Sequence, residues 1–477
     1  MSRFAAILPE LILSIGGVVL MLVAAFAGRR GASLTSWLAI AVLLAATAAL
    51  VGAPSHAGAV FDGLLAADLF ASFGKAIMFP AAAAAIIAAH GWFEREHEHG
   101  AEFPVLILFA AMGMSIMVSS TSLISLYVGL ELNSLAGYVL ASYRRTDARS
   151  AEAGLKYFVL GALASGILLY GISLLYGFTG TTSFTGVAAA FGREAPSLGL
   201  LFGLVFLLAG LAFKISAVPF HMWTPDVYEG APTPVTAFFA TAPKVAAVVL
   251  ATRVCLDALG PATDAWRQIV IFAALASVFL GAIAGYGQTN IKRLLAYSSI
   301  NNVGFVLIGL AGGGAAGASA VLFYLAVYVP MTLGAFLCVL WMRDKDGNPV
   351  EDIASLAGLA QTRPAFALAM FVFMFSLAGV PPFFGFWAKL VVFDAAIQAG
   401  LFPLAVAGII GAVIGAYYYL KIVKVMYIDD PAEPYARVRE PVQGALMLLS
   451  AVAVSPLGYL FIGTLGTLAD RAAGSML

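Results

Sequence analysis

The sequence predicts an all-α polytopic membrane protein of about 14 transmembrane helices, with two inverted five-helix repeats and two broken helices. Three observations predict this fold: an extreme composition, a series of long apolar runs, and two proline-rich interruptions at corresponding places. Of the 477 residues, 62% are hydrophobic and only 10% are charged, against roughly 45–50% and about 25% in soluble chains. So few polar side chains cannot cover the surface of a soluble protein of this length.

Charge and cysteine content exclude several other classes of protein. The formal net charge is zero, with 25 basic and 25 acidic residues, so no basic face for nucleic acid is expected. The two cysteines, Cys255 and Cys338, lie alone in separate apolar runs. No cysteine or histidine spacing fits zinc, haem or an iron–sulfur cluster. We therefore expect no metal or cofactor in this chain.

Apolar runs long enough to cross the hydrocarbon core, about 20 residues each, recur along the whole chain. The first is interpreted as a retained span, because no small-residue cleavage site of a signal peptide follows it. The expected spans are 5–27, 34–51, 69–89, 103–119, 122–143, 151–177, 197–218, 234–256, 266–287, 291–311, 317–341, 365–397, 403–427 and 442–468.

An even number of spans places both termini on one side of the membrane, and the basic residues indicate which side. If the termini are outside, the inside loops hold fifteen arginines and lysines, and five lysines lie within spans. The outside then holds Arg3, Arg193, Arg253, Arg267 and Arg471. Because basic residues accumulate in cytoplasmic loops, both termini are expected to be periplasmic.

Three short matches at an offset of about 165 residues indicate an internal repeat. Residues 137–140 match 304–307, residues 157–158 match 323–324, and Val218-Pro219 matches Val380-Pro381. The repeated units would be spans 4–8 and 9–13, and since five is odd, the second unit would be inverted. The expected division is 1–100 (three N-terminal helices), 101–258 (first repeat), 259–428 (second repeat) and 429–477 (C-terminal helix).

Proline interrupts one span in each repeat. The first interruption, near 218–225, contains Pro219 and Pro225, and the second, near 379–383, contains Pro381 and Pro382. Each proline removes a backbone donor and clashes with the preceding turn. Simple kinks in packing helices are one interpretation. Paired breaks, each beside a lysine, favour the second, a transport site with irregular backbone at membrane depth.

Several charges lie deep within spans, where each costs about 2.5–3.5 kcal/mol by insertion scales. Glu131, Lys214, Lys244 and Lys389 are central, so we expect them to face one another or water and to form a proton path. Alternatively, Glu131 forms a structural ion pair with one lysine. By position, Lys214 would lie near the negative end of a half-helix and Lys389 near the positive end of the next.

Three further residues are possible members of this path. Lys156 and Lys75 lie nearer the ends of their spans and could instead extend to the membrane surface. His221 lies in the first interruption, where a structural histidine is as consistent with the sequence as a titrating one.

Six blocks carry a family resemblance that covers nearly the whole chain. They are Tyr127-Val-Gly-Leu-Glu-Leu, 152–162, 213–232, Ala242-Pro-Lys, 290–300 and Gly379-Val-Pro-Pro. They resemble the antiporter-like subunits of respiratory complex I (proton-translocating NADH:quinone oxidoreductase), a family that includes Mrp-type cation/proton antiporter subunits. Block 213–232 is the most specific to the family, and block 152–162 is similar to its subunit N branch.

The resemblance implies roles for individual residues. Glu131 looks like the family's fifth-helix glutamate, and Lys214, Lys244 and Lys389 look like its seventh-, eighth- and twelfth-helix lysines. At the offset that aligns the glycines, Ser298 falls opposite Glu131, so the second repeat lacks a matching carboxylate.

The resemblance also implies a function: a proton-translocating subunit in the membrane arm of complex I, in a bacterial inner membrane. FMN and iron–sulfur clusters would lie in partner subunits, NADH and quinone would be the substrates of the complex, and antiporter-like subunits would be neighbours. An Mrp-type cation/proton antiporter subunit and a non-translocating structural subunit are the alternatives.

Overall fold

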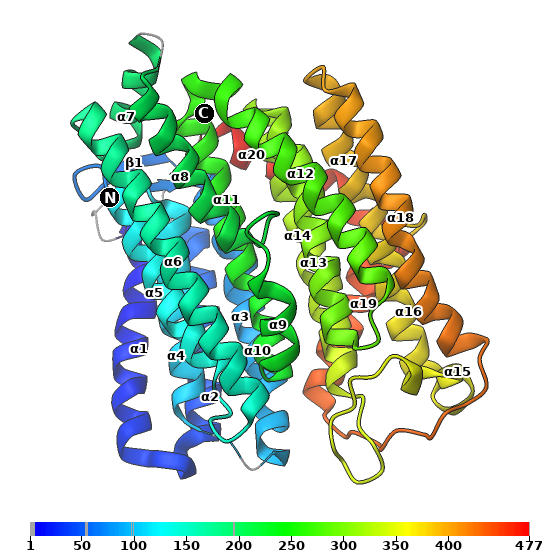
Figure 1. Cartoon of the computed structure of the whole chain (residues 1–477). Coiled ribbons are helices and arrows are strands. Elements are labelled where there is room, and N and C mark those ends of the chain that lie inside the picture. Colours follow the sequence, from blue (N-terminus) through cyan, green and yellow to red (C-terminus); the bar gives the residue numbers. More distant parts are fainter. Residues whose placement is uncertain (1–4, 53–55, 97, 99, 194–195, 477) are drawn as a thin grey trace.

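The computed structural model describes residues 5–52, 56–96, 98, 100–193 and 196–476, which form a bundle of long helices (Figure 1). Within these residues, twelve helices are long and apolar enough to cross a membrane, or thirteen if one bent pair counts as a span. The prediction of an all-α, multi-span membrane protein is therefore confirmed. The start of α1 and the end of α20 lie at the same end of the bundle, hereafter the termini end.

The elements of the N-terminal half are α1 (Leu8–Ala27), α2 (Ala32–Ala49), β1 (His56–Val60), β2 (Leu65–Asp68), α3 (Leu69–Arg95), α4 (Glu102–Ser119), α5 (Leu123–Ala141), α6 (Ala148–Thr179), α7 (Phe184–Arg193), α8 (Leu198–Ile215), α9 (Trp223–Gly230), α10 (Thr233–Phe239) and α11 (Ala242–Arg253), which continues into a π-helical turn (Val254–Ala258). Those of the C-terminal half are α12 (Thr263–Tyr286), α13 (Ile291–Gly312), α14 (Gly314–Leu340), α15 (Leu359–Thr362), α16 (Pro364–Ala378), α17 (Phe384–Gln398), α18 (Phe402–Tyr427), α19 (Pro441–Val454) and α20 (Ile462–Gly474).

Three of the expected spans are divided into shorter helices, and one of them, 234–256, consists of α10 and α11. Span 365–397 consists of α16 and α17, which have 15 residues each and flank the second proline-rich break. Span 442–468 was expected to be continuous, but α19 and the helical segment after it are bent by 65°. The bend follows Ser455, which has extended backbone (ψ 178°) and precedes a proline, as expected because proline disfavours helical backbone in the residue before it.

Two small elements at the termini end were not predicted from the sequence. Strands β1 and β2 form an antiparallel hairpin, and the short helix α7 lies between α6 and α8. Neither is long enough to produce a membrane-length apolar run, which was the signal used to find helices.

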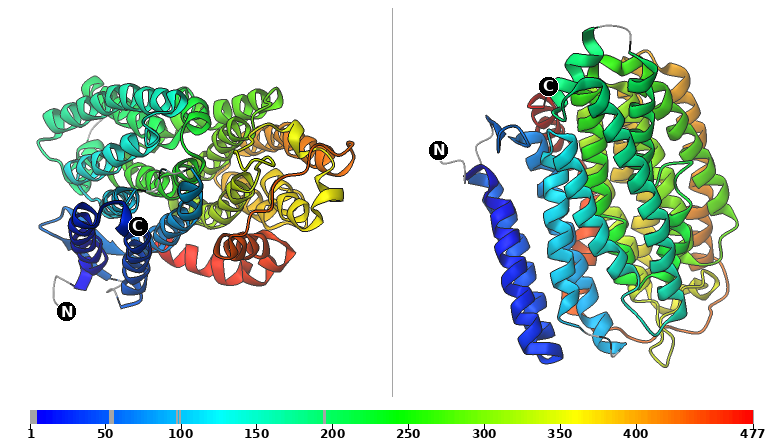
Figure 2. Two further views of the ribbon diagram at one scale, coloured as in Figure 1. Left: turned by 90° about the horizontal axis from the view of Figure 1, so that it is seen from below. Right: turned by 60° about the vertical axis from the view of Figure 1, so that its left-hand side comes forward.

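Glycines allow two pairs of helices to pack backbone against backbone. A Cβ atom on Gly113 of α4 would lie 2.6 Å from the backbone nitrogen of Asn133 on α5. A Cβ atom on Gly281 of α12 would lie 2.7 Å from the backbone nitrogen of Asn301 on α13. Small residues give such close approach in membrane helices. Viewed along the bundle, the α4–α5 pair and the α12–α13 pair lie on opposite sides, with α1, α2 and α19 along one edge (Figure 2, left).

Candidate functional site

The first break separates α8 from α9. The chain turns at Ser216, whose φ of 66° is left-handed, and helix resumes at Trp223. The carbonyl oxygen of Phe213 accepts a hydrogen bond from the Trp223 indole at 3.0 Å. The amide of Val218 donates to Oγ of Ser277 on α12 at 2.9 Å. Side chains thus satisfy backbone groups that the break frees, as irregular backbone inside a membrane bundle requires.

The second break separates α16 from α17 and is tighter. It turns at Gly379, whose φ is 77°. The amide of Gly385 donates to Oγ of Ser376 at 3.1 Å, and a Cβ atom on Gly385 would lie only 1.9 Å from the carbonyl oxygen of Ser376. Glycine is therefore required where α17 starts against the end of α16.

The four prolines expected to break helices occupy two kinds of position. Pro219, Pro381 and Pro382 lie in the breaks, and the Val218–Pro219 and Pro381–Pro382 peptide bonds are cis. Pro225 lies in the first turn of α9. Backbone N–H groups in the first turn of a helix have no intrahelical acceptor. The missing N–H of Pro225 therefore breaks no helical hydrogen bond, and Pro225 does not interrupt a helix.

Lys214 lies in the last turn of α8 and is 8% exposed. Its ammonium donates to Oγ of Ser134 on α5 at 2.9 Å and lies 6.0 Å from the centre of the Tyr157 ring. It therefore faces the interior of the bundle, between α5 and α6.

Lys244 lies on α11 and is 3% exposed. Its ammonium donates to Oγ of Ser299 on α13 at 2.6 Å and to Oγ of Ser216 at 3.4 Å. Ser216 is the turning residue of the first break. Lys244 thus connects that break to the second half of the chain.

Lys389 lies on α17 and is 6% exposed. Its ammonium donates to the carbonyl oxygens of Ala378 at 2.8 Å and Leu377 at 3.1 Å. These carbonyls end α16, so the charge lies at the negative end of a helix dipole. The prediction that Lys389 lies at the positive end of a helix was wrong, because the side chain points back across the break to the preceding half-helix.

Glu131 is half-buried on α5 and accepts a hydrogen bond from Ser165 on α6. Oγ of Ser165 also lies 3.3 Å from the Tyr127 hydroxyl, which can donate to it. Among the described residues Glu131 has no ion pair within 4.0 Å, which is not the arrangement that a structural Glu131–lysine pair would give. Ser134, the partner of Lys214, lies one helical turn away on the same helix. The Lys214 ammonium is therefore bonded about one helical turn of α5 away from Glu131.

A chain of buried hydroxyl and amide groups on α13 was not predicted from the sequence. Ser299 bonds the Tyr328 hydroxyl at 2.8 Å, and Asn302 accepts from the Tyr324 hydroxyl at 2.6 Å. Ser298, which the repeat places opposite Glu131, bonds the Tyr419 hydroxyl at 2.5 Å. The sequence does carry a sign of this chain, because four polar residues lie within one apolar span at spacings that make them neighbours on a helix. They are Ser298, Ser299, Asn301 and Asn302.

The three possible members of the path are placed apart from one another. Lys75 on α3 pairs with buried Glu10 on α1 at 2.5 Å. Lys156 on α6 pairs with Asp226 at 2.8 Å and Glu152 at 2.7 Å. His221 lies half-buried in the first break.

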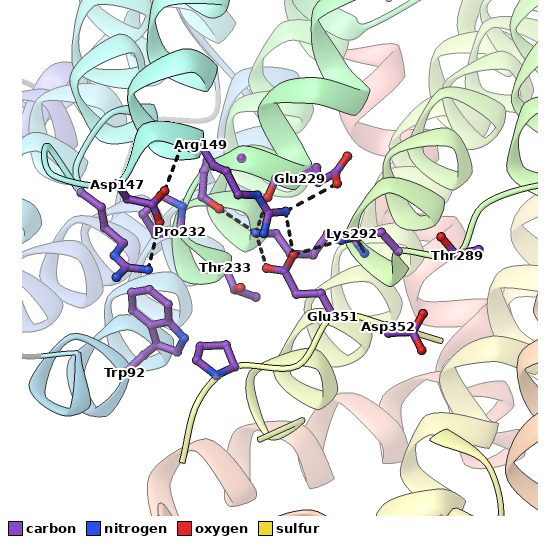
Figure 3. Close-up of a pocket in the computed structure, with 15 residues that line it drawn as sticks. Trp92, Asp147, Arg149, Glu229, Pro232, Thr233, Thr289, Lys292, Glu351 and Asp352 are labelled. Carbon is purple, nitrogen blue, oxygen red and sulfur yellow. Dashed lines mark hydrogen bonds and ion pairs between the residues drawn. The ribbon is translucent and has the colours of Figure 1, made fainter. Parts of the chain in front are cut away.

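A charged cavity of about 540 Å³ (Figure 3) lies beside α9 and the loop after α14, toward the end of the bundle opposite the termini end (Figure 1). It is lined by residues from both halves, including Arg149, Glu229, Lys292 and Glu351. The Lys292 ammonium, 2% exposed, bonds the Glu351 carboxylate at 3.0 Å. We call this cavity the ionic vestibule. Its ion pairs join α6, α9, α13 and the loop after α14.

Glu351 lies in a loop outside the spans. Burial would raise the pKa of its carboxyl group, but the Lys292 ammonium and the Asn290 amide outweigh burial and hold the pKa below its ordinary value. A lowered carboxyl pKa means that the pair stabilises the fold fully above about pH 4.3, the ordinary value. The contribution is lost as the pH falls further.

We expect Glu351→Gln to destabilise the protein by about 3 kcal/mol at neutral pH, because removing one partner of a buried pair costs about 3–5 kcal/mol. The loss should lie at the lower end, since Lys292 keeps bonds to the carbonyls of Glu229 and Ala231. The measurement is thermal unfolding of the detergent-solubilised protein. Glu433→Gln is the control, because its pair with Lys345 is 70% and 62% exposed and should contribute less than about 1 kcal/mol. Equal shifts for the two variants would contradict the argument.

No group of three or more histidine, cysteine, aspartate or glutamate residues in the described part of the chain could hold a metal ion. Cys255 and Cys338 are buried and unbridged.

The chain is similar to known proteins over its whole length. A family model described as NADH:quinone oxidoreductase/Mrp antiporter, TM, matches residues 120–415. The NADH-quinone oxidoreductase subunit N of Rhizorhabdus wittichii is 60% identical over 477 residues, 100% of this chain and 99% of that protein. Subunit N 1 of Rhizobium meliloti is 50% identical over 468 residues, 98% of this chain and 96% of that protein.

Solved structures share the fold. A chain of respiratory complex I from Thermus thermophilus is 31% identical with a TM-score of 0.82, over 97% of this chain and 99% of that chain. A chain of the Mrp complex from Dietzia sp. has a TM-score of 0.84 over 100% of this chain and 98% of that chain, at 21% identity, and supports the fold alone. The chain therefore belongs to the NADH:quinone oxidoreductase/Mrp antiporter transmembrane family.

Proposed function

We propose that this chain is a membrane-arm subunit of a bacterial NADH:quinone oxidoreductase and that it translocates protons. Relatives of 50–60% identity that bear the name subunit N support the place in the complex. The observation that carries the transport role is that three buried lysines lie at the two helix breaks. Lys214 is in the last turn before the first break, Lys244 donates to Ser216 in that break, and Lys389 donates to the carbonyls that end α16. FMN and iron–sulfur clusters belong to partner subunits, which oxidise NADH and reduce quinone.

In the proposed path, protons move along Glu131, Lys214, Lys244 and Lys389. A hydroxyl both donates and accepts, so serine side chains can relay protons between these groups. Ser134 accepts from Lys214, and Ser216 and Ser299 accept from Lys244. Buried waters would complete the remaining gaps.

The possible members receive distinct proposed roles. The entrance for protons is formed by the ionic vestibule and by Lys156, which lies on α6 about two turns beyond Arg149 of the vestibule. His221, in the first break, exchanges protons near Lys214. Lys75 and its partner Glu10 form an ion pair outside the proposed proton path.

The proposed site is the bacterial inner membrane, with both termini periplasmic. The end of the bundle opposite the termini end carries the larger share of arginine and lysine, as cytoplasmic ends do. Arg3 lies outside the described residues. We also propose the division into three N-terminal helices (1–100), two inverted repeats (101–258 and 259–428) and a C-terminal part (429–477). The broken helices α8–α9 and α16–α17 support this division.

Two other functions make different predictions. An Mrp-type antiporter subunit would exchange cations for protons and would not co-purify with a flavin and iron–sulfur arm; the shared fold with the Dietzia chain supports considering it. A structural subunit would tolerate apolar replacement of its buried charges.

Glu131→Gln is the test of the proposed function. The glutamine keeps the shape and an acceptor for Ser165 but carries no titratable proton. We expect proton pumping by the assembled complex to fall by about a hundredfold, a typical contribution of a proton-transferring group. Glu131→Asp is the matched control and should retain a measurable part of the activity. Unchanged pumping in an assembled Glu131→Gln complex would refute the role of Glu131.

A further inference from the structure

A groove of about 650 Å³ runs between α16 and α19, outside the proposed proton path. Its walls are apolar and include Phe366 and Leu368 on α16 and Met447 and Leu448 on α19. Leu368 is 56% exposed and Leu448 is 65% exposed. The groove therefore opens outward from the bundle, toward the bilayer, and not toward the core.

One end of the groove lies at the level expected for lipid headgroups. Trp341 lines this end, and its indole donates to the Gln443 side chain at 3.2 Å. Tryptophan gathers where hydrocarbon meets water. Arg363, the residue before α16, lines the same end. The groove thus has a cationic mouth at the interface and an apolar interior.

The cations at this mouth lack carboxylate partners. Nη2 of Arg363 is buried and makes no hydrogen bond among the described residues. Burial and, to a smaller extent, the neighbouring Arg437 lower the pKa of Arg363, although an arginine stays charged. Arg437 likewise has no carboxylate partner in the described part of the chain. Two like charges near enough to repel each other, one of them half-buried, favour an anion close to them.

We propose that this groove binds an anionic phospholipid, with its phosphate at Arg363 and Arg437 and one acyl chain between α16 and α19. The length of the groove agrees with one chain. Residues 444–455 line it, a helical length of about 17 Å, and one leaflet of the hydrocarbon core is about 15 Å thick. The anion requirement disfavours a neutral lipid. A helix from a neighbouring subunit would need to bring its own carboxylate to the mouth.

The test is photo-crosslinking of the whole purified complex in nanodiscs of phosphatidylcholine. The probes are phosphatidylglycerol and phosphatidylcholine with the same diazirine-bearing acyl chain, added in equal amounts in separate samples. Mass spectrometry measures labelling of the peptides that carry 364–372 and 444–455. We expect about thirtyfold more labelling by phosphatidylglycerol, the preference that about 1 kcal/mol from each of the two arginines gives. Raising the salt to about 1 M should shrink this preference, because it shortens the screening length to about 3 Å.

Four variants separate the charge from the groove. Arg363→Gln should remove most of the phosphatidylglycerol preference, and Arg363→Lys should keep most of it. Arg193→Gln is the matched control, since it removes an exposed arginine at the termini end and should leave the ratio unchanged. Ala369→Phe, which fills the groove, should reduce labelling by both probes.

Three outcomes would overturn the proposal. They are equal labelling by the two probes in the unmodified complex, a preference that persists at high salt, and crosslinks from these peptides to a neighbouring subunit in place of lipid. The salt titration and the probe comparison use the unmodified chain, so they decide the question even if a variant fails to assemble.

Discussion

Replacing Lys214 with methionine is expected to stop proton pumping while electron transfer from NADH to an artificial acceptor continues. Methionine is an unbranched, apolar side chain that fills the same space but carries no proton. The Lys214 ammonium is buried and bonded to Ser134, one turn from Glu131, so its loss removes the connection between the carboxylate and the first break. We expect pumping to fall by about a hundredfold or more. Quinone reduction should fall to the extent that it is coupled to pumping.

Arginine at the same position separates charge from proton transfer. Lys214→Arg keeps a cation and hydrogen-bond donors, but a guanidinium does not release its proton at physiological pH. If Lys214 relays protons, the arginine variant should be as inactive as the methionine variant. Lys424→Met is the control, because Lys424 is 56% exposed and pairs at the surface with Asp429. Both activities are measured in one membrane preparation with assembly verified. Loss of the artificial-acceptor activity in an assembled Lys214→Met complex would refute a purely translocating role.

The sequence predicted the helices well because the bilayer imposes a single strong constraint. A span must be apolar over about 20 residues, so span 103–119 corresponds closely to α4 (Glu102–Ser119). It also predicted that central lysines would turn inward, since a lone charge cannot face lipid. Lys214, Lys244 and Lys389 are indeed buried.

Partners and turns were harder to predict because they depend on distant residues. Glu10, the partner of Lys75, precedes it by 65 positions in an ordinary apolar run. Proline alone did not identify the breaks either. Pro80 and Pro330 lie inside the continuous helices α3 and α14, where neighbouring groups can compensate for the lost donor.

The placement of Lys389 shows why the direction of a side chain matters as much as its position. Counting residues from the second break put the charge near the start of α17. The side chain instead extends back across the break to the carbonyls of Leu377 and Ala378, because side chains on a helix point toward its N-terminus. Gly379, in the break, leaves room for it: a Cβ atom there would lie 2.7 Å from Cδ of Lys389 and 3.0 Å from its Nζ.

Gly379→Ala is therefore expected to impair proton pumping without removing a charge. The added methyl group would displace the Lys389 side chain from the end of α16, and a displacement on the order of 1 Å at a reacting group can cost about a hundredfold in rate. We expect a loss of at least about tenfold in pumping by the assembled complex, and a larger loss for Lys389→Met. Artificial-acceptor activity should be retained in both.

Gly400→Ala is the matched control for backbone strain. Gly379 and Gly400 have nearly the same left-handed backbone, with φ of 77° and 78°, so alanine costs about 1–2 kcal/mol at either position. A Cβ atom on Gly400 would meet nothing within 4 Å, so only Gly379→Ala displaces a lysine. If both variants lost pumping equally, strain and not the placement of Lys389 would be the cause. If only Gly379→Ala lost it, the contact between Lys389 and the end of α16 would be part of the proposed proton path.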